Sequence, residues 1–428
     1  MKRSTDRILT THTGSLPLPE LVRRGLAAKR RGETYDQAAH DAALTNGIGA
    51  VVRQQIEVGV DVVDDGELSK TSWNDYVVHR IGGLERIARS RAHGAAPWSV
   101  AQGIVRPRET GLARNDIDGA PRHFRTDIAE FHDLARSQSD AHDNGGMAYV
   151  CAGPLNWRDF AAVETDIARL AAAAATEHPH DVFMSALSPG CFARFFRNEY
   201  YSDEETYLQA IADVMSREYQ AIVAAGFVLQ LDCPDLASGA NTDYADLSVK
   251  QFRKVIEQHV ECLNYALKTI PPEQARIHIC WGNYEGPHHR DIALSDIIDI
   301  VLKAEAAGIT VESANPRHGH EWKIWQERKL PEGKILFPGV IDDTTYFIEH
   351  PELVAERIVR FAKLVGKENV IACTDCGLRH LPDASLALAK LYALSEGAKL
   401  ATRELWRRSG SSRSSRSTAS LRSNRSKN

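Results

Sequence analysis

The segment RIHICWGNYEGPHHRDIALSDIIDIVLKAEAAGITVES, residues 276–313, predicts a strand, a helix and a second strand in succession. Residues 276–280 and 309–313 are short apolar runs with β-branched side chains, and residues 291–307 between them repeat apolar side chains at helical spacing. Gly308 marks the end of that helix. A helix between two such strands is typical of a parallel sheet, so this segment indicates an α/β fold.

The same alternation extends in both directions along the chain. Helical patterns cover 204–225, 245–267 and 351–365. Strands are expected at 61–65, 147–151, 182–186, 227–231, 276–280, 309–313, 335–340 and 370–374. Eight strand and helix units predict a single closed (β/α)8 TIM barrel over residues 1–406. The polar stretch 85–135 has little periodicity, and we expect it to be an insertion after the first strand.

Composition excludes several classes of protein. Hydrophobic residues make up 43% and charged residues 25% of the 428 residues, which is typical of a globular protein. No apolar run approaches the roughly 20 residues that span a bilayer, and the start of the chain lacks the apolar stretch of a secretory signal. The expected location is the cytoplasm. Seven cysteines, an odd number in a long chain, indicate buried side chains, metal ligands or nucleophiles rather than a disulfide scaffold.

Charge is unevenly distributed. Residues 407–428 carry seven basic and no acidic residues, so removing +7 from the net charge of -5 leaves about -12 on the rest. An acidic body argues against a nucleic-acid surface on the folded domain. No membrane partner is expected, and an RNA- or membrane-surface role of the basic segment 407–428 is the alternative. The Ser/Arg-rich segment 407–428 is expected to be a disordered tail because it cannot bury a core. The sequence leaves the oligomeric state open.

Polar side chains cluster at the expected carboxyl ends of the strands, where TIM barrels carry their active sites. His278 and Cys280 lie two residues apart on one strand, so both side chains point to the same face. Glu312 and Cys376 lie at the ends of neighbouring expected strands. Imidazole, thiolate and carboxylate groups suit tetrahedral Zn²⁺, so these four residues are predicted to bind zinc.

Alternatives remain for individual residues of this set. His278 could be a hydrogen-bonded core histidine, Glu312 could pair with Arg317, and Cys373 with Cys376 could form a redox pair. The histidines at 288, 289, 318 and 320 lie in expected loops and are interpreted as substrate contacts or surface residues. A thiol bound to zinc loses its proton at neutral pH and becomes a nucleophile. Two thiolate ligands favour this chemistry over hydrolysis, because their negative charge weakens the activation of water.

Seven ordered motifs resemble the cobalamin-independent methionine synthase family. They are TTHTGSLP (10–17), DDGELSK (64–70), LQLDCPDLA (229–237), HICWGNYEGPH (278–288), VESANPRHGHEW (311–322), PGVIDDTT (338–345) and TDCGL (374–378). The resemblance covers roughly residues 7–406 and matches the C-terminal catalytic barrel of that family.

The resemblance implies the same zinc ligands, His278, Cys280, Glu312 and Cys376. It also implies that Ser15, Glu67 and Asp232 bind homocysteine. Their chemistry is suitable, because two carboxylates can bind an ammonium group and a hydroxyl can bind a carboxylate. Asp342 is expected to be a catalytic organiser or proton relay. Residues 73–76 and 281–289 are expected to line the site of the alkyl donor.

The chain departs from the family pattern at two positions of the motifs. Cys233 stands where the family has glutamate, and Thr344 stands where it has a proton-donating histidine. Asp343 is a candidate to replace that histidine, because departure of a tertiary amine needs a nearby acid.

The expected function is zinc-dependent methyl or alkyl transfer to a small thiol, most like 5-methyltetrahydropteroyltriglutamate–homocysteine S-methyltransferase. The first alternative is alkylation of another thiol, because short chains of this kind are also similar to epoxyalkane:coenzyme M transferases. The alternatives from other classes are a metal-free decarboxylase and a non-catalytic binding protein.

Overall fold

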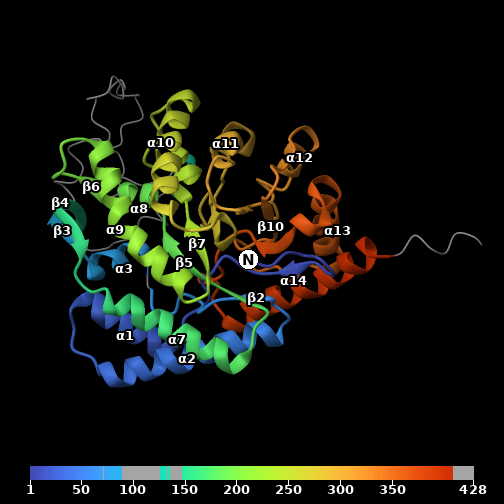
Figure 1. The fold of residues 1–428 in the computed structure, drawn as a ribbon, viewed down its shortest axis with the longest axis horizontal. Coiled ribbons are helices and arrows are strands. Elements are labelled where there is room, and N and C mark those ends of the chain that lie inside the picture. Colours follow the sequence, from blue (N-terminus) through green and yellow to red (C-terminus); the bar gives the residue numbers. More distant parts are fainter. Residues whose placement is uncertain (71, 89–125, 132, 135–146, 408–428) are drawn as a thin grey trace, which may run out of the picture.

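The computed structural model describes residues 1–70, 72–88, 126–131, 133, 134 and 147–407. Eight parallel strands form a barrel in the order β1-β11-β10-β9-β8-β7-β5-β2 (Figure 1). The strands are β1 (Leu9–Thr10), β2 (Val62–Val63), β5 (Asp181–Leu187), β7 (Val228–Asp232), β8 (Ala275–His278), β9 (Gly308–Val311), β10 (Ile335–Ile341) and β11 (Ile371–Thr374). The predicted TIM barrel is confirmed.

The barrel closes where its two shortest strands meet. The backbone N–H of Asp61, just before β2, donates to the carbonyl of Thr10 in β1 at 3.1 Å. The Asp61 carboxylate accepts the N–H of Thr10 at 2.9 Å, and the Thr11 hydroxyl donates to the carbonyl of Val62 at 2.9 Å. Side chains therefore supply part of the bonding that longer strands would provide through their backbones.

Helices of 4 to 22 residues surround the strands (Figure 1). They are α1 (Glu20–Arg31), α2 (Gln37–Glu57), α3 (Trp73–Arg80), α5 (Thr126–Ala129), α7 (Ala161–Glu177), α8 (Pro189–Phe195), α9 (Glu204–Ala224), α10 (Val249–Leu267), α11 (Leu294–Val301), α12 (Ile324–Glu327), α13 (Pro351–Val365) and α14 (Ala384–Leu405). Short 3-10 helices occupy Pro234–Leu236, Ser238–Asn241, Pro272–Gln274, Glu321–Lys323 and Lys367–Asn369.

Local sequence explains where the expected helices begin. The Ser248 hydroxyl accepts the N–H of Gln251 while the Gln251 side chain accepts the N–H of Ser248, a capping box that starts α10. The Asp203 carboxylate caps the start of α9 by accepting the N–H of Thr206. The helix expected at 291–307 is shorter, because α11 ends at Val301.

A separate three-stranded sheet corrects two details of the sequence prediction. Its strands are β3 (Ile81–Ala88), β4 (Met147–Trp157) and β6 (Arg197–Asn198), in the order β3-β4-β6. Residues 147–151, expected as a barrel strand, therefore lie outside the barrel. The missing strand is β1, which has only two residues and polar neighbours. Consequently the insertion follows the second barrel strand, not the first.

Parts of two predicted segments lie outside the described residues. These are 89–125 of the insertion and 408–428 of the tail, so the domain boundary at 406/407 stays a prediction. Every helix in the described part of the chain is too short or too polar to span a bilayer.

One buried cation fixes the face of β8 that carries the site. Arg276 is 1% exposed, and its guanidinium donates to the side chain of Gln230 at 2.9 Å and to the carbonyl of His12 at 2.9 Å. It also lies 3.8 Å from the ring centre of Phe183. Side chains alternate along a strand, so His278 shares the face of Arg276 and lies one step nearer the carboxyl end of the barrel.

Candidate metal centre and substrate cavity

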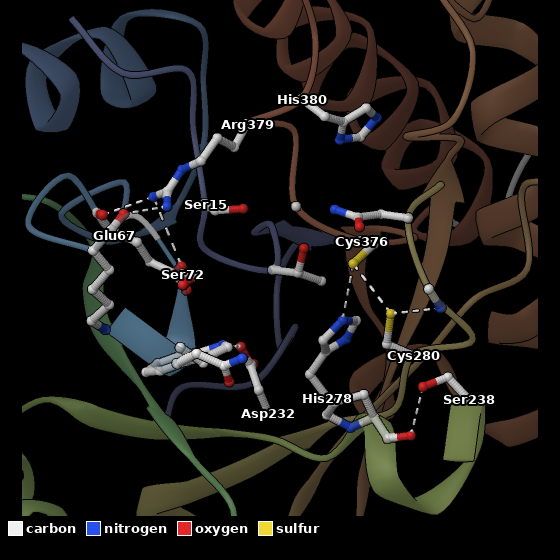
Figure 2. A pocket seen from close by; sticks show the side chains of 18 of the residues that line it. Ser15, Glu67, Ser72, Asp232, Ser238, His278, Cys280, Cys376, Arg379 and His380 are labelled. Carbon is white, nitrogen blue, oxygen red and sulfur yellow. Dashed lines mark hydrogen bonds and ion pairs between the residues drawn. The ribbon is translucent and has the colours of Figure 1, made fainter. Parts of the chain in front are cut away.

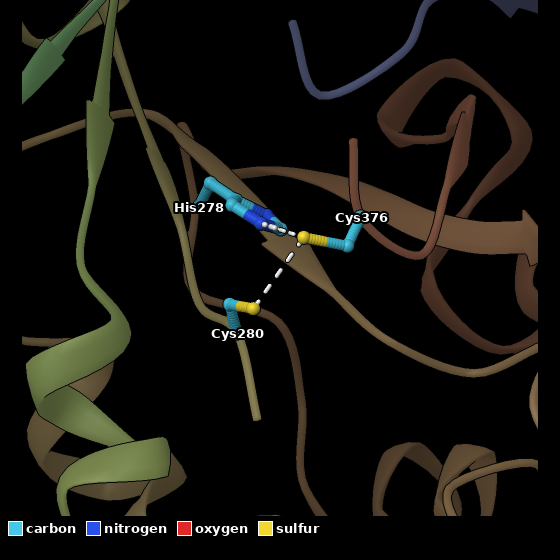
Figure 3. Close-up of side chains that lie close together, drawn as sticks. All are labelled: His278, Cys280 and Cys376. Atoms are coloured by element: carbon cyan, nitrogen blue, oxygen red, sulfur yellow. Dashed lines mark hydrogen bonds between the residues drawn. The ribbon is translucent and has the colours of Figure 1, made fainter. Parts of the chain in front are cut away.

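Three predicted metal ligands meet at the carboxyl ends of two barrel strands. His278 is the last residue of β8, Cys280 follows two residues later, and Cys376 lies two residues after β11. Their ligand atoms lie within 4.8 Å of one another (Figure 3). The Cys376 sulfur is 3.4 Å from the Cys280 sulfur and 3.5 Å from Nε2 of His278.

These distances fit a tetrahedral metal ion. Ligand bonds of about 2.0–2.3 Å place neighbouring donor atoms roughly 3.5–3.8 Å apart around zinc. Two sulfurs 3.4 Å apart are free thiols, because a disulfide bond is only about 2.05 Å long. All three side chains are buried. The group could therefore hold a metal ion with little movement of the side chains.

The hydrogen bond between Cys280 and Cys376 shifts the pKa values of the two thiols in opposite directions. The hydrogen bond from Cys376 lowers the pKa of Cys280 well below its usual range, and the nearby His278 acts in the same direction. The N–H of Gly282 also donates to the Cys280 sulfur at 3.0 Å. The site thus stabilises a thiolate, which is the form of cysteine that binds a metal.

Glu312, the fourth predicted ligand, lies beside this group but not within it. It directly follows β9, and its carboxylate accepts the N–H of Trp281 at 2.8 Å and the side-chain amide of Asn315 at 2.9 Å. Burial, followed by the charge of Cys280, raises the pKa of Glu312 well above its usual value. The structure thus brings together three of the four predicted ligands. Glu312, the fourth, is bonded to Trp281, the residue that follows Cys280.

Asp375 holds the loop that follows β9. Its carboxylate accepts the backbone N–H groups of Ser313 at 2.7 Å, Ala314 at 2.9 Å and Asn315 at 2.8 Å. The carboxylate is completely buried, and burial raises its pKa to about 6. Asp375 therefore fixes the segment that carries Glu312 and at the same time precedes Cys376.

The three predicted thiol-substrate residues line the same cavity as the metal group. The cavity has a volume of about 490 Å³, and its lining includes Ser15, Glu67 and Asp232 as well as His278, Cys280 and Cys376 (Figure 2). Ser15 follows β1, Glu67 follows β2, and Asp232 ends β7. Residues far apart in the chain thus meet at one end of the barrel.

Two carboxylates make the end of the cavity opposite the sulfurs acidic. Burial, followed by the charge of Glu67, raises the pKa of Asp232 to about 7. The Asp232 carboxylate accepts the indole N–H of Trp73 at 3.0 Å and the amide of Gln230 at 2.9 Å. The Ser185 hydroxyl donates to Glu67 at 2.5 Å. This arrangement fits a cationic group, which would relieve the repulsion between the two acids.

Glycines permit the close approach of these residues. A Cβ atom on Gly377 would lie 2.0 Å from the Ser15 hydroxyl oxygen. Gly14 has a φ of +121°, and a Cβ there would lie 2.7 Å from the Glu67 carboxylate. The glycines of the GS and DCG motifs are therefore explained by the geometry of the cavity.

Several cavity residues were not identified from the sequence. Arg379 donates to the carbonyls of Gly66 at 3.0 Å and Glu67 at 2.7 Å, and His380 lines the cavity near Cys376. Lys70 donates to the carbonyl of Ser185 at 2.7 Å. Arg379 and His380 directly follow the DCGL segment, and that adjacency was the available signal.

Asp342, the predicted catalytic residue, is placed differently. Its carboxylate accepts the N–H of Thr344 at 2.9 Å and the hydroxyls of Thr344 and Thr345 at 2.8 Å each. Asp343 is 1% exposed. Among the described residues that line the 490 Å³ cavity, neither aspartate is present. The structure therefore gives Asp342 the role of organising its own turn.

The segments expected at the alkyl donor divide between two cavities. Trp73, Asn74, Gly282 and Asn283 line the 490 Å³ cavity. Residues 284–288 line a second cavity of about 690 Å³ together with residues 315–317 and 344–347. Tyr76 is buried, and its hydroxyl bonds to Glu218 instead.

Two of the loop histidines belong to a buried network. Both rings contact the same oxygen of Asp291: Nδ1 of His288 lies 2.6 Å from it and Nε2 of His318 lies 3.2 Å from it. Nδ1 of His318 also lies 3.0 Å from a carboxylate oxygen of Glu321. Although burial opposes it, bonds to the two acids raise the pKa of His318 to about 9. His318 is 2% exposed, so its interpretation as a surface residue is wrong, while a contact with substrate stays a prediction. His289 and His320 are exposed.

Cys373 does not join the site. It is completely buried among Leu9, Ile335, Phe337 and Ile371, and burial raises its pKa to about 12. A redox pair of Cys373 with Cys376 is therefore not supported by the geometry.

The chain is similar to known proteins in sequence and in structure. No protein-family model matches the chain. The chain is 23% identical over 403 residues to a methionine synthase from Thermococcus kodakarensis, covering 93% of this chain and 94% of that protein. It is 24% identical over 408 residues to a methionine synthase from Saccharolobus solfataricus, covering 93% and 96%.

Two solved structures share the fold. A B12-independent methionine synthase from a Shewanella species, in complex with selenomethionine, has a TM-score of 0.66 at 19% identity and covers 93% of this chain and 99% of that one. A putative B12-independent methionine synthase from Listeria monocytogenes has a TM-score of 0.59 at 16% identity, covering 94% and 99%. The resemblance predicted from the motifs is confirmed.

Proposed function

We propose that this member of the methionine synthase family transfers a methyl group from a tertiary amine donor to the sulfur of homocysteine, using a zinc ion. The observation that carries the proposal is the shared cavity. Its one end presents His278, Cys280 and Cys376, and its other end presents Glu67 and Asp232. Homocysteine has a thiol at one end and an ammonium group at the other, so its chemistry matches both ends.

The residues of the metal group are proposed to bind zinc. His278, Cys280 and Cys376 would hold the ion, and Glu312 would complete the set after a side-chain rotation away from Trp281. Zinc bound there supplies a Lewis acid that keeps a substrate thiol deprotonated at neutral pH. Rotation of Glu312 is compatible with its loop, because Asp375 holds the backbone of that loop rather than the Glu312 side chain.

The acidic end is proposed to orient the amino acid. Glu67 and Asp232 would bind the ammonium group, and the Ser15 hydroxyl would bind the carboxylate. Trp73 keeps Asp232 in place through its indole N–H at 3.0 Å. Arg379 fixes the loop of Glu67 through the carbonyls of residues 66 and 67. The amino acid would then lie with its sulfur towards the metal group.

The same acidic end disfavours the alternative thiol. Coenzyme M carries a sulfonate in place of an ammonium group, and the two carboxylates would repel it. Lys70 and Arg379 also line the cavity, but their side chains already donate to backbone carbonyls. The geometry therefore favours an amino-acid thiol over coenzyme M.

Purified protein tests both parts of the proposal. We expect about one zinc ion per chain by metal analysis, and formation of methionine from homocysteine and a methyltetrahydropteroylglutamate donor. Parallel reactions contain coenzyme M with an epoxide. Product from the epoxide reaction alone would replace the proposed function by the alternative. Absence of any bound metal would overturn the zinc proposal.

We also propose the cytoplasm as the site of action. All seven cysteines are free thiols, and five of them are outside the metal group. Such a chain fits a reducing compartment.

A further inference from the structure

We propose that His380 is the general acid that protonates the amine leaving group. The proposal builds on the methyl transfer proposed above and adds a residue to it. As the sulfur forms its bond to the methyl carbon, the carbon–nitrogen bond breaks and its electron pair stays on nitrogen. Without a proton the leaving nitrogen would be an anion, so the step needs an acid within reach of that nitrogen.

Residue 344, where the family has its proton-donating histidine, does not supply this proton. Thr344 stands there, and its hydroxyl donates to Asp342 at 2.8 Å. The neighbouring Asp343 is 1% exposed, and neither residue is among the described residues lining the 490 Å³ cavity. The chemistry therefore requires an acid from another part of the chain.

Among the described residues, two histidines line this cavity, His278 and His380. His278 belongs to the metal group, so a bound metal would occupy one of its ring nitrogens. Glu67 and Asp232 also line the cavity, but the proposed ammonium group would keep both carboxylates ionised. Lysine and arginine side chains hold their protons too tightly at neutral pH. His380 is the remaining group with suitable proton chemistry.

The position of the His380 ring suits a proton donor. Its Nε2 lies 2.7 Å from the backbone carbonyl of Asp343, which can only accept, so Nε2 carries hydrogen. In the protonated ring, Nδ1 carries the second proton, and this is the proton that His380 would donate to the leaving nitrogen. Figure 2 shows His380 on the side of Cys376, whereas Arg379 points towards Glu67. The acid therefore lies at the end of the cavity where the sulfur would react.

Partial exposure allows the proton to be replaced. The His380 side chain is 29% exposed, so solvent can reprotonate it after each transfer. The carboxyl group of Asp343 faces the ring, with its Oδ2 4.0 Å from Nε2, and burial raises the pKa of this group well above its usual value. In the complete step, Nδ1–H gives its proton to nitrogen, the secondary amine leaves, and neutral His380 keeps Nε2–H on the carbonyl of Asp343.

The test compares two methyl donors in one variant. In His380→Asn, the amide can still donate to the carbonyl of Asp343 but cannot supply a proton at neutral pH. With a methyltetrahydropteroylglutamate donor, we expect the methylation of homocysteine to slow by about 100-fold or more. With methyl iodide the rate should be unchanged, because iodide leaves without a proton. Homocysteine affinity, zinc content and melting temperature should also be unchanged.

Further variants separate acid catalysis from structure. His320→Asn changes an exposed histidine and should have no effect with either donor. His380→Gln serves as a second variant if His380→Asn melts at a lower temperature. The wild-type rate with the amine donor should be lower in alkaline than in neutral buffer, and this pH dependence should be lost in the variant.

Two results would overturn the assignment of His380. One is an unchanged rate with the amine donor, and the other is an equal loss with both donors. If the wild-type protein methylates homocysteine with methyl iodide but with no amine donor, then the proposed donor is wrong, and the role of His380 falls with it.

Discussion

The two ends of the substrate cavity are built in different ways. At the sulfur end, which His278, Cys280 and Cys376 form, each side chain lies on a strand or within two residues of one. The distances of 3.4 and 3.5 Å join side chains at the carboxyl ends of β8 and β11. At the acidic end, Glu67 and Asp232 depend on contacts with Ser185, Trp73 and the loop held by Arg379.

This difference indicates two kinds of sensitivity. A change at the sulfur end should remove a ligand and thus the metal, while leaving the pocket for the amino acid intact. A change at the acidic end should weaken binding of the amino acid, while leaving the metal in place. Variants that affect one property without the other would support the division.

Loss of a sulfur ligand should have the largest effect. In Cys280→Ser, we expect zinc affinity to fall by more than about 100-fold, since loss of residues that merely support ligands costs 10- to 100-fold. Metal analysis after dialysis against a chelator measures the loss. Cys262→Ser is the matched control, because Cys262 is outside the site and its thiol donates to the carbonyl of Leu208. Retention of zinc in Cys280→Ser would contradict the metal centre.

A change at the acidic end should come next. Glu67→Gln removes one charge that faces the ammonium group, and we expect homocysteine to bind about 30-fold more weakly, equivalent to roughly 2 kcal/mol. Calorimetry measures the affinity. Propanethiol lacks the amino acid group, so its affinity should not change. An equal loss for both thiols would show that the two ends are not independent.

A supporting residue of the sulfur end should have a smaller effect. Asp375→Asn weakens the bonds to the backbone of residues 313–315, and we expect zinc affinity to fall by about tenfold. Asp299→Asn, which breaks a partly exposed pair with Arg253, is the control and should leave zinc binding unchanged. A wild-type zinc affinity in Asp375→Asn would mean that this loop does not position a ligand.

The pH dependence of homocysteine binding should show the smallest effect. Asp232 binds an ammonium group only when ionised, and its pKa is about 7 in the free protein. The ratio of wild-type to Asp232→Asn affinity should therefore rise by up to about tenfold between pH 6 and pH 8.

The stability of the ligand-free protein should change in the opposite direction. Because the folded-state pKa of Asp232 is above the unfolded value of about 3.9, its contribution to stability is present below pH 4 and lost as the pH rises through 7. Melting curves of the wild-type protein and Asp232→Asn measure this. A pH-independent affinity ratio would contradict the ionisation of Asp232 in this range.

Sequence patterns predicted the sulfur end well because each of its side chains is placed by the strand that it belongs to or directly follows. Alternation along β8 places His278 and Cys280 on one face, and the end of β11 places Cys376 opposite them. The orientation of Glu312 depends on bonds to Trp281 and Asn315, which the sequence pattern does not reveal.

The failures arose where distant residues decide the structure. β1 is only two residues long and is held by β11 and by the Asp61 side chain, so no periodic pattern marks it. The apolar run at 147–151 was assigned to the barrel because its pattern cannot show that it pairs with β3. Arg379 contacts residues 66 and 67, more than 300 positions away, and its own neighbours do not reveal this.

The short β1–β2 junction would couple opening of the barrel to binding of the proposed substrate. Ser15 follows β1 and Glu67 follows β2, so an amino acid bound to both would bridge the junction. Local opening there would require release of the ligand, and at 100 times its dissociation constant the ligand adds about 2.7 kcal/mol to the free energy of opening. Hydrogen exchange of the Asp61 amide, which bonds across the junction to Thr10, would then report substrate occupancy from the far side of the strands.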